Sequence, residues 1–158
     1  MDYKAFNGIL DTVIPQLKEG AFLLSGKEKN AMTIGWLQFG IIWGKPICTV
    51  FVRKSRYSHE LMENQNEFEI CVPVSGEMKA ELSFCGSKSG RDTDKTNVVN
   101  SNSKVYVKIA CKTVAKTEMD MNNVDESILE RYYNTNQATN DGDPHTIYFG
   151  EVTAVTVK

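Results

Sequence analysis

The sequence of 158 residues has no long apolar stretch and little net charge. No apolar run approaches the roughly 20 residues that a helix needs to cross a membrane, and the N-terminus lacks the basic and apolar regions of a secretion signal. Eighteen basic and twenty acidic residues give a formal charge of −2, which provides no overall attraction to nucleic acid or to an anionic membrane. We therefore expect a cytoplasmic protein with neither as a partner.

The sequence also lacks the motifs of several common sites. None of its four cysteines forms a CxxC pair or has a histidine at metal-ligand spacing, so no metal site is predicted. Cys71 and Cys111 alternate with apolar residues and are expected to be reduced thiols in or near a core. A Walker A loop and the GxGxxG motif of dinucleotide-binding domains are absent, and no Ser/His/Asp or Cys/His triad follows from the spacing.

Most of the chain has the pattern of β-strands. Apolar runs, or alternation of apolar and polar residues, predict strands at 21–25, 31–43, 47–53, 67–73, 104–112 and 145–157. Gly35, Gly40 and Gly150 interrupt these runs, which suggests a bulge or a ligand lying against the backbone. Closely spaced strands with few helices predict a mainly β fold, a barrel with short helices, and the length fits a single domain over 1–158.

Three short helices are predicted between the strands. Ser58 is expected to cap a helix that runs to about Asn64, and the spacing of Met78 and Leu82 indicates a second. The third is expected to start at Asn123 with a pattern like a capping box, followed by an apolar face up to residue 132.

Six consecutive residues that can donate hydrogen bonds, 53–58, stand between a strand and the first predicted helix. Backbone N–H groups at a helix start lack partners and carry the positive end of the dipole. The two arginines of the stretch can add bidentate contacts to an anion, so it suits a terminal phosphate. A solvated basic turn is the alternative, and taken alone the pattern slightly favours it.

Two further stretches have the composition of a binding site. CGSKSGRDTDK (85–95) combines glycines, serines and three basic residues, and it predicts either a backbone nest for an anion or, equally, a surface loop. In NAMTIGW (30–36) the glycine would let a flat ring approach the main chain, although a core strand with a bulge is favoured. No role is assigned to His59, expected to be exposed, or to His145, expected to pack at a strand start.

These three stretches occur together and in order, and on them the sequence resembles the flavin reductase-like family with the FMN-binding split barrel, which includes the flavoredoxins. The matching segments span about 20–152. The resemblance implies a mainly β, Greek-key split barrel and a homodimer with flavin near the subunit interface. Ser58 stands where the family usually has threonine, and the polar region 118–144 is longer than usual, so we expect it to cover the active site or extend the dimer contact.

The resemblance implies that FMN is the cofactor and that its 5′-phosphate is the anion. The residues implied on or near the phosphate are Arg53, Ser55, Arg56, Tyr57 and Ser58. Those implied along the flavin ring and ribityl chain are Asn30, Met32, Thr33 and Trp36. Those implied to complete the pocket are Cys85, Gly86, Ser89, Gly90 and Lys95. No side chain is expected as a catalytic acid or base, and Thr33 is the candidate donor to the flavin edge.

The implied activity is that of a flavin reductase-like oxidoreductase. Hydride passes from NAD(P)H to the flavin, and electrons go on to an acceptor, so the flavin supplies the chemistry and the protein orients it. The alternative is a carrier that holds FMN tightly and is reduced by a small redox protein rather than by NAD(P)H. A barrel that has lost flavin is a third reading, which the intact phosphate stretch opposes.

Overall fold

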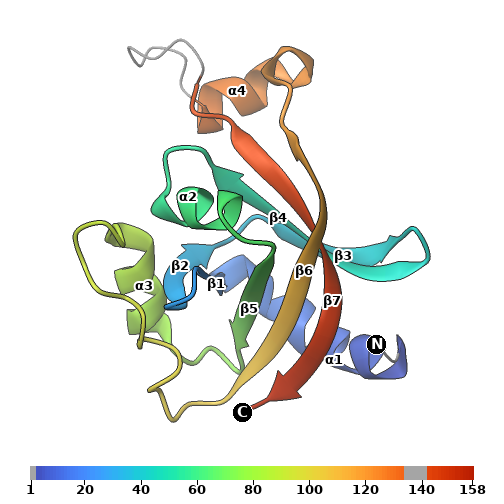
Figure 1. Ribbon diagram of the computed structural model, residues 1–158, viewed down its shortest axis with the longest axis vertical. Helices are drawn as coiled ribbons and strands as arrows, with labels where there is room; N and C mark the ends of the chain where they lie inside the picture. Colours follow the sequence, from blue (N-terminus) through green and yellow to red (C-terminus); the bar gives the residue numbers. More distant parts are fainter. Residues whose placement is uncertain (1–2, 134–141) are drawn as a thin grey trace.

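Seven strands form one antiparallel sheet in the computed structural model, which describes residues 3–133 and 142–158 (Figure 1). The strands are β1 (Ala21–Ser25), β2 (Asn30–Ile34), β3 (Leu37–Ile42), β4 (Lys45–Arg53), β5 (Glu67–Pro73), β6 (Tyr106–Glu118) and β7 (His145–Val157). The helical elements are α1 (Tyr3–Gln16), η1 (Leu17–Glu19), α2 (Tyr57–Glu63), α3 (Lys79–Ser87), η2 (Met121–Asn123) and α4 (Glu126–Tyr132). The predicted mainly β fold is confirmed.

The order of the strands, β2-β1-β5-β6-β7-β4-β3, puts β2 and β3 at opposite edges of the sheet. Only Gly35 and Trp36 connect these two strands, and three Cα–Cα steps span at most about 11 Å. The sheet must therefore curl until its edges meet, although β2 and β3 do not pair there within the described chain. This curled, incompletely closed sheet is the expected split barrel, and the single strand predicted at 31–43 is wrong because the chain changes edges at Gly35.

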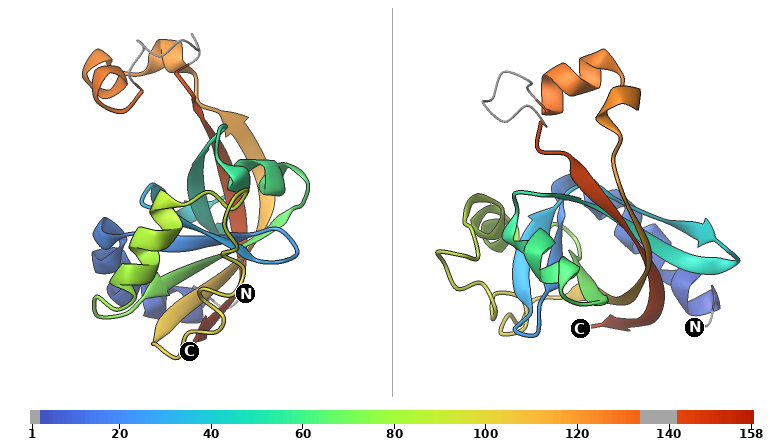
Figure 2. Two further views of the ribbon diagram at one scale, coloured as in Figure 1. Left: turned by 90° about the vertical axis from the view of Figure 1, so that its left-hand side faces the viewer. Right: turned by 45° about the horizontal axis from the view of Figure 1, so that its top comes forward.

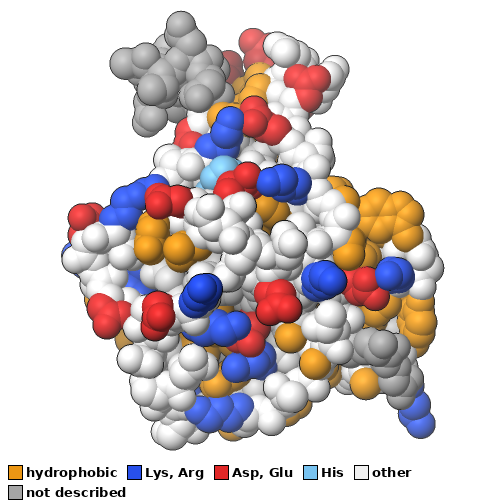
Figure 3. Space-filling view, in the orientation of Figure 1, with side chains coloured by type: hydrophobic (Ala, Val, Ile, Leu, Met, Phe, Trp, Pro, Cys, Tyr) orange, Lys and Arg blue, Asp and Glu red, His pale blue; other side chains and the backbone are white. Residues whose placement is uncertain are grey.

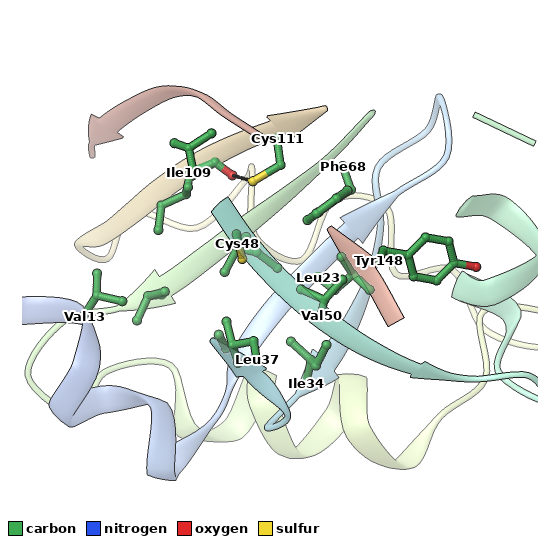
Figure 4. Close-up of a cluster of buried hydrophobic side chains, with 14 of the residues drawn as sticks. Val13, Leu23, Ile34, Leu37, Cys48, Val50, Phe68, Ile109, Cys111 and Tyr148 are labelled. Carbon is green, nitrogen blue, oxygen red and sulfur yellow. Dashed lines mark hydrogen bonds between the residues drawn. The ribbon is translucent and has the colours of Figure 1, made fainter. Parts of the chain in front are cut away.

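Two groups of buried side chains stabilise the barrel. The larger fills its interior, where Figure 4 shows Leu23, Val50, Phe68 and Tyr148 from four different strands. The smaller lies between α3 and the outer face of β1, and includes Phe22. Strand β1 is consequently buried at all five positions, which explains why its sequence is continuously apolar rather than alternating.

The expectation that Cys71 and Cys111 are reduced and buried is confirmed, and Cys48 and Cys85 are also free thiols in the interior. Cys48 and Cys111 belong to the core inside the barrel (Figure 4), whereas Cys71 and Cys85 belong to the outer group. Burial raises the pKa of the Cys71 thiol to about 12. At neutral pH this thiol is therefore protonated and unreactive.

The predicted helices near 58–64 and 78–82 correspond to α2 and α3, but Ser58 does not cap α2, because the N-cap position is Arg56 and Ser58 lies inside the helix. The predicted start of the third helix is also wrong. Asn123 ends η2, and α4 begins after Asp125, whose carboxylate accepts a hydrogen bond from the Ser127 N–H group (3.0 Å). Aspartate at that position satisfies the first free N–H groups of the helix. The sequence also gave no prediction of α1, which buries Phe6 and Val13 in the main core.

Between β6 and β7 the chain makes an excursion, residues 119–144, whose described part includes η2 and α4. These helices stand away from the barrel at the far ends of the two strands (Figure 2). At the β3 edge of the sheet, the β3–β4 hairpin exposes Ile41 and Trp43 (54% and 62% exposed), and apolar side chains gather there in Figure 3. No helix in the described ranges is long and apolar enough to span a membrane.

Core side chains pack so closely against Gly150 in β7 that they leave no room for a Cβ atom. A Cβ atom at this position would lie 2.4 Å from Cζ of Phe68 and 2.9 Å from Cβ of Cys111. We expect Gly150→Ala to lower the free energy of unfolding by about 1–3 kcal/mol, as overpacking of a dense core does. The measurement is urea unfolding, with Gly40→Ala as the matched strand control because no atom lies within 4 Å of its added Cβ. An equal loss in both variants would contradict the packing explanation.

Candidate flavin site

Two cavities of about 260 Å³ each lie side by side at one end of the barrel and share Met32 and Arg56. Helices α2 and α3 both lie against β2 there (Figure 1). We call the first the anion cavity; it is lined by Asn30, Met32, Ser55, Arg56, Tyr57, Ser58, Ser87, Lys88, Ser89, Gly90, Arg91 and Lys95. We call the second the ring cavity; it is lined by Met32, Thr33, Ile34, Gly35, Trp36, Phe51, Arg53, Arg56 and His145.

All the charged side chains that line the anion cavity are positive. Four of its lining residues are basic and none is acidic, although the whole chain has a formal charge of −2. Within the described residues, neither Arg56 nor Lys95 forms an ion pair with a carboxylate. A concave surface with convergent cations and several hydroxyl groups is suited to a multiply charged anion.

Lys95 is the most unusual of these cations because it is 2% exposed. Its ammonium group donates to the Lys88 carbonyl (2.7 Å) and the Cys85 carbonyl (3.3 Å). Burial, with a smaller contribution from Arg56, lowers its pKa. A desolvated cation is costly unless an opposite charge is supplied, so Lys95 favours a ligand that brings a negative charge into this cavity.

The turn before α2 orients the donors of the anion cavity. The Arg56 N–H group donates to the Arg53 carbonyl. The Nε atom of its side chain contacts Sδ of Met32 (3.2 Å), which also lines the cavity. Ser58 is buried, and its hydroxyl accepts from Asn30 (3.4 Å). Because α2 has only seven residues, the side-chain cations rather than a helix dipole carry the charge of this site.

Ser55 has an internal partner in this structure. Its N–H group and its hydroxyl donate to the two carboxylate oxygens of Asp143, at 2.9 and 2.6 Å. The Lys54 N–H group donates to the Pro144 carbonyl (3.1 Å). The end of the 119–144 excursion is therefore hydrogen bonded directly to the turn that forms the anion cavity.

Gly90 lies in a tightly packed part of the wall of the anion cavity. A Cβ atom on Gly90 would lie 2.3 Å from Oδ1 of Asn30 and 2.7 Å from Cδ1 of Tyr57. Only glycine leaves room for these two side chains in the wall. The requirement explains why a glycine stands at this point of the 85–95 loop.

Aromatic side chains form one wall of the ring cavity. Trp36 stacks on the imidazole of His145, with ring centroids 4.5 Å apart and an interplanar angle of 22°. The Tyr133 hydroxyl is 2.6 Å from Nδ1 of His145, and the Arg53 guanidinium lies 4.9 Å from the centre of the Tyr133 ring. Flat walls of this kind suit a planar ligand.

His145 is buried at 5% exposure, and its pKa falls to about 4 because of that burial and of the nearby Arg53 charge. The imidazole is therefore neutral at neutral pH. The sequence around His145 gives no sign of a site, since its position after Pro144 indicates only the start of a strand. His59 was also misjudged: it is half-buried, and Nε2 lies 2.9 Å from the Thr146 hydroxyl.

Four of the predicted site residues either lie outside the cavity expected for them or have a donor group that is already hydrogen bonded within the protein. Arg53 lines the ring cavity rather than the anion cavity, and donates to the carbonyls of Asp143 (3.2 Å) and Tyr132 in the excursion. The Thr33 hydroxyl donates to a carbonyl of α3 (2.5 Å), so its proton is already engaged. Cys85 and Gly86 line neither cavity, although the Cys85 carbonyl accepts a hydrogen bond from Lys95 and a Cβ atom on Gly86 would lie 3.4 Å from Cβ of Thr33.

The fold brings the remaining predicted residues together around the two cavities. Those on the anion cavity are Asn30, Met32, Ser55, Arg56, Tyr57, Ser58, Ser89, Gly90 and Lys95, and Trp36 lies on the ring cavity. Lining residues that the sequence analysis did not select are Ser87, Lys88, Arg91, Ile34, Gly35, Phe51 and His145. Five of these lie in stretches already singled out, at 30–36 and 85–95. No cluster suited to a metal ion occurs among the residues that the structure describes.

Residues 17–158 match the model of the flavin reductase like domain. The chain belongs to this family. Three solved structures illustrate the likeness. Flavoredoxin from Methanosarcina acetivorans is 20% identical, with 87% of this chain and 67% of that chain covered and a TM-score of 0.62. An FMN-binding protein from Thermus thermophilus is 18% identical, with 87% and 70% covered and a TM-score of 0.60.

The third, an NADH:FAD oxidoreductase from Streptomyces globisporus, is 18% identical, with 90% of this chain and 80% of that chain covered and a TM-score of 0.58. At these identities the likeness establishes the split barrel and not a shared substrate. No curated protein matches the chain.

Proposed function

We propose that this protein is an FMN-dependent oxidoreductase that takes hydride from NAD(P)H and passes electrons to an acceptor. The observation that carries the proposal is the anion cavity, with four basic and no acidic lining residues, beside an aromatic-walled ring cavity. FMN combines a dianionic phosphate with a planar ring, and the two adjoining cavities match that combination. The similar structures support it, since they include an FMN-binding protein and an NADH:FAD oxidoreductase.

The residues of the chain have distinct roles in this proposal. Arg56 and Lys95 hold the phosphate, because both are cations without a carboxylate partner among the described residues. Met32 lies at the junction of the cavities and faces the linker between phosphate and ring. Trp36 and neutral His145 form the wall of the ring cavity and exclude water from it.

Flavin, when bound, supplies the redox chemistry, and the protein contributes binding, orientation and electrostatics. No lining side chain is required to act as an acid or base. The Arg53 and Arg56 guanidinium groups line the ring cavity, so they favour negative charge that develops on a ligand there. The Thr33 hydroxyl becomes a donor to the ring edge only if it leaves the α3 carbonyl that it contacts in this structure.

A second function has specific support. Flavoredoxin is among the similar structures, and the stack of Trp36 on His145 lies at the ring cavity, where a nicotinamide would need access to the flavin. Both features favour an electron carrier with tightly held FMN that a small redox protein reduces. The proposal also includes a homodimer and a cytoplasmic location. Sedimentation of the flavin-loaded protein measures the oligomeric state.

The test is an anaerobic titration of the FMN-loaded protein with NADH and with NADPH, followed in the visible spectrum. We expect the flavin bands to bleach promptly with one or both nucleotides, and the faster one identifies the donor. Bands that persist with both nucleotides but bleach with a reduced ferredoxin or rubredoxin favour the carrier. A protein that remains colourless and binds no added FMN contradicts the assignment of both cavities.

A further inference from the structure

The end of the 119–144 excursion brings a carboxylate to the wall of the anion cavity. The Asp143 side chain accepts from both hydrogen-bond donors of Ser55: Oδ1 accepts from the N–H group (2.9 Å) and Oδ2 from the hydroxyl (2.6 Å). Ser55 lines the anion cavity, whereas Asp143 does not. The carboxylate therefore lies behind the cavity wall and is connected to the cavity through Ser55.

The backbone around Asp143 directs its side chain toward the turn before α2. Gly142 and Asp143 have positive φ angles of 65° and 51°, a left-handed conformation that aspartate and asparagine adopt more readily than most residues. The Asp143 carbonyl accepts from the Arg53 guanidinium (3.2 Å), and the Pro144 carbonyl accepts from the Lys54 N–H group (3.1 Å). Three consecutive residues of the turn therefore hold the carboxylate in place.

These bonds decide which groups Ser55 offers to a ligand in the anion cavity. A hydroxyl has one proton and two lone pairs, so a hydroxyl that donates to Asp143 keeps only acceptor capacity for the cavity. The single proton of the Ser55 N–H group is engaged as well. A phosphate dianion accepts hydrogen bonds and donates none, so Ser55 offers it no donor in this arrangement. The carboxylate charge behind the wall also repels a second anion.

We propose that Asp143 determines how strongly the anion cavity holds a phosphate: it takes both Ser55 protons and adds a negative charge, so a phosphate dianion binds weakly enough to exchange. The inference rests on the proposed function, which supplies FMN as the ligand. The four basic lining residues attract the phosphate, and Asp143 opposes them without blocking the cavity. Asp143 is thus a specificity-determining residue that disfavours doubly charged ligands, and it acts through Ser55 rather than by touching the flavin.

Asp143→Asn tests the proposal without cutting the connection between the excursion and the turn. The amide oxygen still accepts from the Ser55 N–H group, while the amide NH₂ group donates to the Ser55 hydroxyl, whose proton then turns to the cavity. Fluorescence titration at about pH 8, where a phosphate monoester is doubly charged, measures the affinities. We expect FMN to bind at least about tenfold more tightly than to the wild type, and riboflavin to change by less than about twofold. Most of the gain should be slower release of FMN.

Three further variants serve as controls. Asp11→Asn removes the same charge from an exposed position of α1 outside both cavities, and it should leave FMN affinity within about twofold. Asp143→Gly, which also suits a positive φ, frees both Ser55 donors and should tighten FMN binding in the same direction. In a Ser55→Ala background the gain from Asp143→Asn should be smaller, because the hydroxyl proton that it frees is absent. An equal gain in that background contradicts action through the Ser55 hydroxyl.

Inorganic phosphate, titrated by calorimetry, separates this inference from the proposed function because it probes the anion cavity without flavin. If FMN binds Asp143→Asn and Asp143→Gly no more tightly than the wild type, Asp143 does not oppose the phosphate, and the inference is wrong while the proposed function stands. If phosphate binds both variants more tightly but FMN binds none of the proteins, the inference stands and the proposed function fails. If neither ligand binds any of the proteins, both are overturned.

Discussion

Arg56→Ala is expected to weaken FMN about ten- to a hundredfold, which corresponds to about 1.5–3 kcal/mol for a lost hydrogen bond to a charged group. Arg56 lines both cavities and has only the Met32 sulfur as a side-chain hydrogen-bond partner among the described residues. Its truncation therefore removes a partner of the ligand without breaking an internal ion pair. Fluorescence titration of FMN measures the affinity.

The controls for Arg56→Ala separate a phosphate contact from general damage. Riboflavin lacks the phosphate, so its affinity should be nearly the same for the variant and the wild type. Lys112→Ala removes an equal charge from an exposed position of β6 outside both cavities, and it should leave FMN affinity unchanged. Equal losses for FMN and riboflavin would show that Arg56 does not contact the phosphate.

Acidification should destabilise the protein by about 3 kcal/mol between pH 6.5 and 4 through His145 alone. Its pKa is lowered from 6.5 to about 4, first by burial and then by Arg53, while Asp143 opposes the shift. In this window the unfolded chain binds a proton that the folded chain does not, so stability falls as pH falls. The contribution of neutral His145 to the free energy of unfolding is fully present above pH 6.5. Below pH 4 both the folded and the unfolded chain bind the proton, so this residue lowers the stability no further. Urea unfolding at a series of pH values measures it.

His145→Phe is the matched variant because a phenyl ring can stack on Trp36 but does not titrate. The Tyr133 hydroxyl loses its imidazole partner but keeps the Met119 sulfur (3.2 Å), so the variant starts from a lower stability. Its stability should then vary less between pH 6.5 and 4 than that of the wild type. Burial also lowers the pKa of His59, the only other histidine, so His59→Gln measures that contribution. A wild-type pH profile in His145→Phe would contradict the assignment.

Secondary structure was predictable where burial of one face alone sets the pattern of apolar and polar residues. Strand β5 alternates because one face meets the core, and Phe68, Ile70 and Val72 point inward as expected. Helix α1 was missed although its apolar residues are buried: Gly8 and Pro15 lower its intrinsic helix propensity, and packing of Phe6 and Val13 against the barrel compensates. The break at Gly35 was also missed, because only the curvature of the whole sheet requires the chain to change edges there.

Local patterns selected most residues of the candidate site, because glycines, serines and cations cluster in short stretches. The sequence could not select His145, which joins the ring cavity through a strand that begins about 110 residues after Trp36. It also could not foresee that Arg53 bonds the excursion rather than lining the anion cavity. Both outcomes depend on contacts between distant segments, which no local spacing encodes.

The sequence by itself determined most of the strands, the burial of Cys71 and Cys111, the family resemblance and the three stretches that surround the candidate site. These follow from side-chain polarity and local backbone preference, which act over a few residues. Only the tertiary structure decided that Arg56 and Lys95 converge without carboxylate partners among the described residues, that His145 is buried against Trp36, and that the anion and ring cavities adjoin. Burial and local charge balance depend on which side chains the fold brings together, so they are set only when the sheet curls into the barrel.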